Sequence, residues 1–119
     1  MERPPDEAVL VRGAPMIAEA LAKSARRPLR RFGFYGLSVF TFPGSTPQQI
    51  ATRAGVPHDE ICTCSARGVR DEGFEVRMTD QLRPGHASLV FPQEPSPDDI
   101  EAVIRVFGQP FFNATRRGR

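Results

Sequence analysis

The chain has 119 residues, of which 39% are hydrophobic and 25% charged, and its formal net charge is +2. These values are typical of a single globular domain with one core. No apolar run approaches the roughly 18 residues that a membrane span needs, so we expect no membrane partner.

The first third of the chain predicts a disordered start, a strand, a helix and a basic connector. Residues 1–7 are acidic and proline-rich and lack the pattern of a signal peptide, so we expect disorder there and a cytoplasmic location. AVLVRG (8–13) predicts a strand, and Pro15 suits the first turn of a helix over residues 15–25, with Ile17 and Leu21 facing inward. RRPLRR (26–31) follows as a basic connector that Pro28 interrupts.

The segment FGFYGLSVFTF (32–42) is the strongest strand candidate. Its alternate residues are apolar on both sides, with four phenylalanines on one face and Tyr35, Leu37 and Val39 on the other. A strand that is apolar on both faces is usually central and covered on both sides. We therefore expect residues 32–42 at the centre of the sheet.

The chain after residue 42 predicts two capped helices and three further strands. Thr46, Pro47 and Gln49 form the pattern of a capping box at the start of a helix over 45–55. Ser96, Pro97 and two aspartates begin a second helix over 96–108 with a 3.6-residue apolar stripe. Strands are expected at residues 60–64, 74–80 and 86–91, and residues 65–73 fit either a helical turn or a loop.

Strands 74–80 and 86–91 alternate cleanly and are separated by a turn, so they are expected to pair. Keeping their apolar faces together sets the register. This register places Met78 opposite Ala87, Val76 opposite Leu89, Arg77 opposite Ser88, and Thr79 opposite His86.

These elements predict an α+β fold. We expect a single domain over residues 8–113, with a mixed or mostly antiparallel sheet of about five strands and about three helices. Residues 114–119 would form a basic tail.

The sequence contains no phosphate-binding loop, dinucleotide fingerprint or zinc-protease motif, so no cofactor is indicated. Cys62 and Cys64 are the only cysteines, and their spacing on a strand disfavours a mutual disulfide. Two cysteines and two histidines are too few for a structural zinc site, so we expect two buried reduced thiols and no metal.

The polar face of the predicted hairpin is the first candidate site. His86, Arg77 and Ser88 are the candidate catalytic residues, because a histidine beside an arginine and a hydroxyl suits acid–base chemistry on a phosphodiester. The alternative is that this face is solvated and has no chemical role.

A group of basic residues and one tyrosine is the second candidate. Guanidinium groups bind phosphates and an aromatic ring can stack on a base. The candidate nucleic-acid-binding residues are Arg26, Arg27, Arg30, Arg31, Tyr35, Arg53 and Arg83. The alternative is a solvated connector, with the surplus of arginine reflecting a GC-rich genome.

Two resemblances extend these interpretations. In size, arginine content and scattered candidate residues the chain resembles small bacterial toxins of toxin–antitoxin modules, which implies an effector acting on nucleic acid, with RNA the expected target. VLVRG (9–13) and GLSVF (36–40) resemble the opening of ADP-ribosyltransferase-like domains, which implies that Arg12 contacts a dinucleotide and Ser38 supports the nicotinamide ribose. Only Glu60 and Glu75 lie on predicted strands as candidates for the glutamate such domains use.

The remaining alternative is a non-catalytic interaction or regulatory module of a toxin–antitoxin or defence system, which would bind a protein partner or form a homodimer. It would use the aromatic C-terminal end, Phe107, Phe111 and Phe112. Whether the protein is an enzyme is left open by the sequence.

Overall fold

The computed structural model describes residues 2–79 and 83–114. Its elements in chain order are β1 (Val9–Gly13), α1 (Ala18–Ser24), α2 (Pro28–Phe32), β2 (Tyr35–Phe40), α3 (Pro47–Ala54), β3 (Glu60–Ser65), α4 (Ala66–Asp71), β4 (Glu75–Met78), β5 (His86–Phe91), α5 (Pro97–Phe107) and β6 (Phe111–Phe112). The α+β class expected from the sequence is confirmed.

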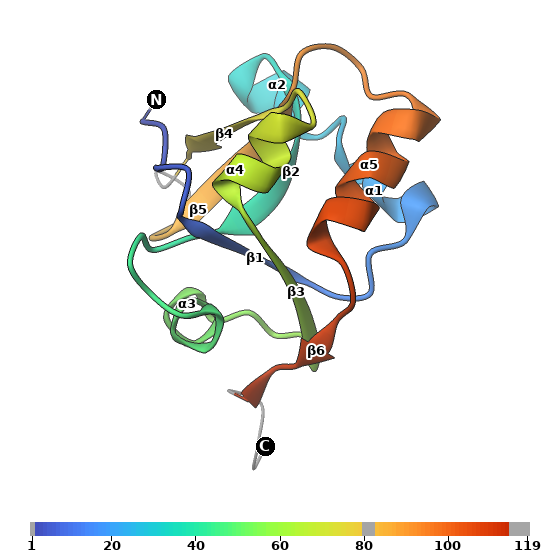
Figure 1. The fold of residues 1–119 in the computed structure, drawn as a ribbon. Helices are drawn as coiled ribbons and strands as arrows, with labels where there is room; N and C mark the ends of the chain where they lie inside the picture. Colours follow the sequence, from blue (N-terminus) through green and yellow to red (C-terminus); the bar gives the residue numbers. More distant parts are fainter. Residues whose placement is uncertain (1, 80–82, 115–119) are drawn as a thin grey trace.

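All pairings between the strands are antiparallel, in the order β4-β5-β2-β1-β3-β6 (Figure 1). The sheet therefore has six strands among the described residues, one more than expected. Strand β2 is central, as its two apolar faces predict. The expected hairpin register is confirmed, with Val76 opposite Leu89 and Arg77 opposite Ser88.

Two apolar clusters lie on opposite faces of the sheet. The larger cluster contains Leu10, Leu37 and Leu89 and packs under α1, α4 and α5. The smaller one contains Val11, Phe40 and Ile61 and packs under α3. Figure 1 shows α1, α4 and α5 together on one side and α3 alone on the other. Helix α3 contacts β1 and β2, so it covers one part of its face.

Three local expectations need correction. The basic connector contains a short helix, α2, because Pro28 occupies its first turn and Gly33 ends it at a φ of 81°. Helix α1 begins at Ala18 instead of Pro15. With this later start, Leu21 and Ala25 point toward the core, whereas Ile17 is exposed and does not take the inward position that its spacing predicts.

Residues 66–71, where the sequence allows a helix or a loop, form α4. The Ser65 side chain accepts a hydrogen bond from the Gly68 backbone N–H and caps it. The capping boxes expected at Thr46 and Ser96 are both present.

The N-terminal segment runs beside the edge strand β4. The Met78 N–H donates to the Glu2 carbonyl oxygen at 2.7 Å, and Arg70 binds both the Asp6 carboxylate and the Pro4 carbonyl oxygen at 2.7 Å. Sequence composition favours disorder here, whereas these contacts hold the segment against β4 and α4. None of the helices in residues 2–79 and 83–114 is long and apolar enough to cross a membrane.

Candidate catalytic site on the sheet

Four side chains, three from β2 and β5 and one from the residue after β4, form a hydrogen-bonded series on the face that α3 partly covers. His86 Nε2 lies 3.0 Å from Ser38 Oγ, and His86 Nδ1 lies 2.6 Å from Thr79 Oγ1. Thr79 Oγ1 also lies 3.2 Å from Ser88 Oγ. Ser38 comes from β2, His86 and Ser88 from β5, and Thr79 directly follows β4. Each ring nitrogen of His86 therefore contacts one hydroxyl group.

The four hydrogen-bonded residues differ in burial. Thr79, His86 and Ser88 are buried, with His86 only 6% exposed, whereas Ser38 is exposed. The interpretation of a fully solvated polar face is therefore wrong for these three residues. Their hydroxyls and ring nitrogens are buried because they hydrogen-bond one another.

The imidazole of His86 favours its neutral form. Burial lowers the pKa of His86, the positive charge of Arg83 lowers it further, and a hydrogen bond to the Thr79 backbone acts in the opposite direction. When Ser38 donates its proton to Nε2, Nδ1 must carry the ring proton and donate it to Thr79 Oγ1. In that tautomer Thr79 Oγ1 accepts the Nδ1 proton, and Nε2 carries the lone pair that faces Ser38.

Aromatic side chains lie before and after Ser38: Phe32 at the end of α2, Phe34 before β2, Phe40 at the end of β2 and Phe42 after it. Phe32 and Phe34 stack at 5.4 Å between ring centroids, and the Phe40 ring packs edge-on against His86 at 5.7 Å. A Cβ at Gly36 would meet the Phe34 ring at 3.1 Å, so Phe34 lies over this glycine. Ser38 is thus the polar position within an aromatic row.

Three arginines stack on this row. The guanidinium carbon of Arg53 lies 3.7 Å from the Phe42 ring centroid, that of Arg83 lies 4.4 Å from Phe40, and that of Arg31 lies 6.0 Å from Phe32. Of the predicted nucleic-acid-binding residues, Arg31, Arg53 and Arg83 therefore lie beside the row, far apart in sequence.

The remaining predicted residues are placed differently. Tyr35 packs against the larger core cluster, which removes it as a base-stacking partner for the arginines. Arg26 lies after α1 and pairs with Glu94 at 3.6 Å. Arg27 precedes α2 as its N-cap, and Arg30 lies in the last turn of α2, exposed.

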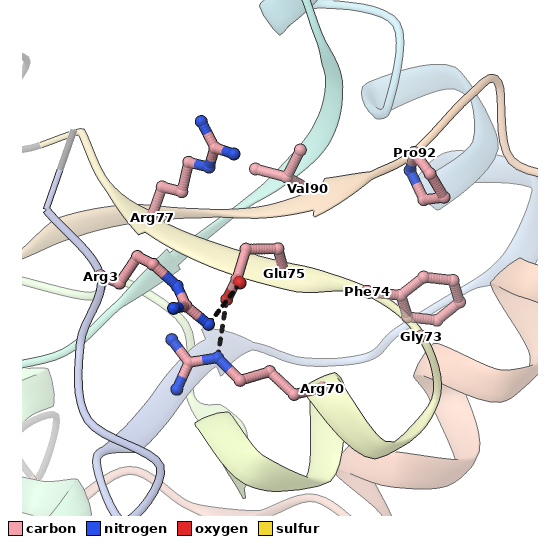
Figure 2. A pocket seen from close by; sticks show the side chains of 8 residues that line it. All are labelled: Arg3, Arg70, Gly73, Phe74, Glu75, Arg77, Val90 and Pro92. Atoms are coloured by element: carbon pink, nitrogen blue, oxygen red, sulfur yellow. Dashed lines mark hydrogen bonds and ion pairs between the residues drawn. The ribbon is translucent and has the colours of Figure 1, made fainter.

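The candidate catalytic residue Arg77 is exposed on β4, opposite Ser88 in the register. It lines a hollow of about 440 Å³ beside β4 that also contains Arg3, Arg70 and Glu75. Figure 2 shows Arg3 and Arg70 pointing toward Glu75, which they contact at 2.7 and 2.6 Å. No salt bridge joins Arg77 to a carboxylate within residues 2–79 and 83–114.

Arg12 is a second unusual cation. Its Nη1 donates to the Ser38 carbonyl oxygen at 2.6 Å, and no carboxylate within the described chain pairs with it. Burial lowers the pKa of Arg12, and repulsion from Arg27 adds to this effect. The two residues of the ADP-ribosyltransferase-like resemblance, Arg12 and Ser38, are thus in contact, although through the Ser38 backbone.

Glutamate candidates for that resemblance lie elsewhere. Glu75 binds Arg70 and Arg3, and Glu60 is exposed on β3 opposite Phe112. In the aromatic C-terminal end, Phe107 is buried in the core, whereas Phe111 and Phe112 are 38% and 51% exposed on the edge strand β6. A protein-binding role for these two phenylalanines stays a prediction.

The two cysteines are free. Cys62 is buried and Cys64 half-buried, and burial raises the pKa of Cys64 to about 12. No group of histidine, cysteine and carboxylate side chains within residues 2–79 and 83–114 could hold a metal ion.

Sequence reasoning found His86 and Ser88 but missed Ser38 as the partner of His86. The missing information was the pairing of β2 with β5, which aligns Phe40 with His86 and Ser38 with Ser88. Given that pairing, alternation alone would have placed Ser38 on the face of His86. Comparisons of this chain with protein-family models, with curated proteins and with solved structures found no match.

Proposed function

We propose that the chain is a small bacterial effector, similar to a toxin, that binds and cleaves RNA on the sheet face carrying Ser38 and His86. The row of stacked phenylalanines and arginines that runs along β2 past this pair carries the proposal. Proteins bind single-stranded nucleic acid with aromatic rings that stack on bases and guanidinium groups that bind phosphates.

His86 supplies acid–base chemistry in this proposal. It is neutral near pH 7, its Nε2 contacts an exposed hydroxyl, and Arg83 lies close enough for its charge to act on the ring. A phosphate bound by Arg83 would therefore lie beside the base. Arg77, exposed opposite Ser88, adds a second cation on the β4 side.

RNA binding is tested by the salt dependence of affinity. The dissociation constant of a fluorescein-labelled single-stranded RNA is measured by anisotropy at several salt concentrations. Arg53→Gln with Arg83→Gln is expected to weaken binding and to reduce the logarithmic salt slope by about 0.7 for each phosphate that the variant no longer binds. Arg105→Gln, on α5 across the sheet, is the matched control and should leave the slope unchanged. Equal effects of both changes, or no binding at low salt, would refute the proposal.

Cleavage is tested on the same RNA and in cells. Induced expression in a bacterial host is expected to arrest growth, and His86→Gln is expected to abolish both arrest and RNA cleavage while leaving RNA affinity within about threefold. Normal growth with folded protein, together with intact RNA in vitro, would contradict the enzymatic part of the proposal.

A dinucleotide-binding function is the second candidate, and Arg12 favours it. A half-buried arginine without a carboxylate partner among the described residues, beside a second arginine, suits an anionic ligand such as a pyrophosphate. Calorimetric titration with NAD tests this function, with Arg12→Ala expected to remove binding and Lys23→Ala, on the outside of α1, expected to preserve it. No heat of binding at millimolar NAD would eliminate this candidate.

A further inference from the structure

Ser38 has the surroundings of an activated nucleophile. A serine hydroxyl is a weak nucleophile at neutral pH unless a base accepts its proton as it attacks. The structural signature is a base within hydrogen-bond reach of the hydroxyl, itself oriented by a third group. Ser38 Oγ, His86 and Thr79 meet this description at 3.0 and 2.6 Å.

The four hydrogen-bonded residues differ in their exposure to solvent, and this difference indicates which of them a substrate can reach. Ser38 is exposed on β2, whereas His86 and Ser88 on the adjacent strand β5, and Thr79 after β4, are buried. The only hydroxyl that a substrate can reach and that also contacts a ring nitrogen, within the described residues, is therefore that of Ser38. The buried Ser88 hydroxyl contacts Thr79 Oγ1 and, within the described residues, no ring nitrogen of His86.

We propose that Ser38 is a nucleophilic serine that attacks phosphodiester phosphorus, with His86 as its general base and Thr79 as a positioning residue. In the first step the Ser38 proton moves to His86 Nε2 and Oγ forms a bond to phosphorus. The bond from phosphorus to the leaving oxygen breaks, and that oxygen takes the proton from Nε2. The product is a phosphodiester of Ser38. Water then gives a proton to His86 Nε2 and attacks phosphorus, the bond from phosphorus to Ser38 Oγ breaks, and Oγ takes the proton from Nε2.

The choice of phosphorus rests on the proposed function, because Arg83 and the aromatic row indicate a nucleic-acid substrate. The nucleophile itself can be tested without RNA. Diisopropyl fluorophosphate reacts with an activated serine by the same step, with fluoride leaving in place of the ribose oxygen. Intact mass and peptide mapping then report which residue carries the phosphoryl group.

Labelling at Ser38 by one diisopropylphosphoryl group is the expected result. Ser38→Ala should remove the label, and Ser45→Ala should keep it, because Ser45 lies in the loop after β2 without a histidine contact in the described structure. His86→Gln should slow labelling at least 100-fold. Thr79→Val should slow it about tenfold while the imidazole remains. Circular dichroism establishes that each variant is folded, and Thr79→Val keeps the inference testable if His86→Gln does not fold.

Three results would overturn the inference: no label on the wild-type chain, a label on another residue, or an undiminished rate in folded His86→Gln or Thr79→Val. RNA assays separate this inference from the proposed function. Labelling at Ser38 without RNA affinity would remove the RNA proposal and leave the nucleophile. RNA cleavage without labelling, and with Ser38→Ala fully active, would leave the RNA proposal and remove the nucleophile.

Discussion

Two buried threonines allow the polar chain to be tested by one substitution made in two places. Thr41 and Thr79 follow β2 and β4 and are 0% and 1% exposed. At 2.9 Å, the Thr41 backbone N–H donates to the Gly85 carbonyl oxygen just before β5, and that of Thr79 to the His86 carbonyl oxygen at the start of β5. Their side chains differ in one respect. Thr79 Oγ1 contacts His86 and Ser88, whereas Thr41 Oγ1 has no hydrogen-bond partner among the described residues.

Replacement of each threonine by valine is therefore expected to change stability in opposite directions. Thr79→Val removes two hydrogen bonds and leaves a buried nitrogen of His86 unpaired, which should cost about 2–3 kcal/mol. Thr41→Val removes a desolvated hydroxyl that has no partner and should stabilise the fold by about 1 kcal/mol. The two variants should thus differ by about 3–4 kcal/mol, or roughly 12–16 °C in melting temperature at about 4 °C per kcal/mol.

Urea unfolding followed by circular dichroism measures both free energies directly. Because valine and threonine have nearly the same shape and both favour strands, differences in packing and propensity largely cancel between the two sites. Equal destabilisation by both substitutions would refute the reasoning, since the change in free energy would then come from shape and not from hydrogen bonding. A stabilising Thr79→Val would show that the polar chain is not formed as described.

Three further predictions concern pH, thiol reactivity and the core. Folding lowers the pKa of His86, so the folded state binds fewer protons than the unfolded state. The free energy of unfolding is therefore highest above the unfolded pKa of about 6.5. It falls as the pH drops below that value, by at most about 1.4 kcal/mol per pH unit. Thermal melts between pH 7.5 and 5 should show this slope in the wild type and lose it in His86→Gln; an unchanged slope would contradict the assignment. At a pKa of about 12, only about one Cys64 thiol in 10⁴ is ionised at pH 8, so iodoacetamide should modify Cys64 far more slowly in the folded than in the unfolded chain. Leu89 is fully buried on β5, and Leu89→Ala should lower the free energy of unfolding by about 2–5 kcal/mol, measured in urea.

Local patterns predicted the parts of the fold that depend on neighbours in sequence. The register of the β4–β5 hairpin followed from keeping Val76 and Leu89 on one face, and the capping boxes at Thr46 and Ser96 followed from three-residue spacing. Helix α2 was missed because its arginines suggested a solvated connector, although Pro28 is an ordinary first helical residue.

The site could be predicted only in part because its residues come together through a long-range pairing. Ser38 and His86 are 48 positions apart, and no periodicity within either strand indicates that β2 and β5 are neighbours. The sequence pattern correctly placed Arg77, Thr79, His86 and Ser88 on one face of the hairpin. The burial of this face depends on side chains of the neighbouring strand β2. Phe40, which packs edge-on against His86, is part of that contribution.

The position of α3 connects the fold to the proposed site. On the face of the sheet opposite α1, α4 and α5, α3 packs on a small apolar cluster that includes Phe40 and Ile61. Next to that cluster the sheet carries His86 and its hydroxyl partners instead of further apolar side chains. Apolar residues at these buried positions would satisfy the requirements of folding more simply, because buried polar groups stabilise a fold only when all of them are paired. The paired polar side chains that end in an exposed serine are therefore the feature on which the proposed chemistry at Ser38 rests.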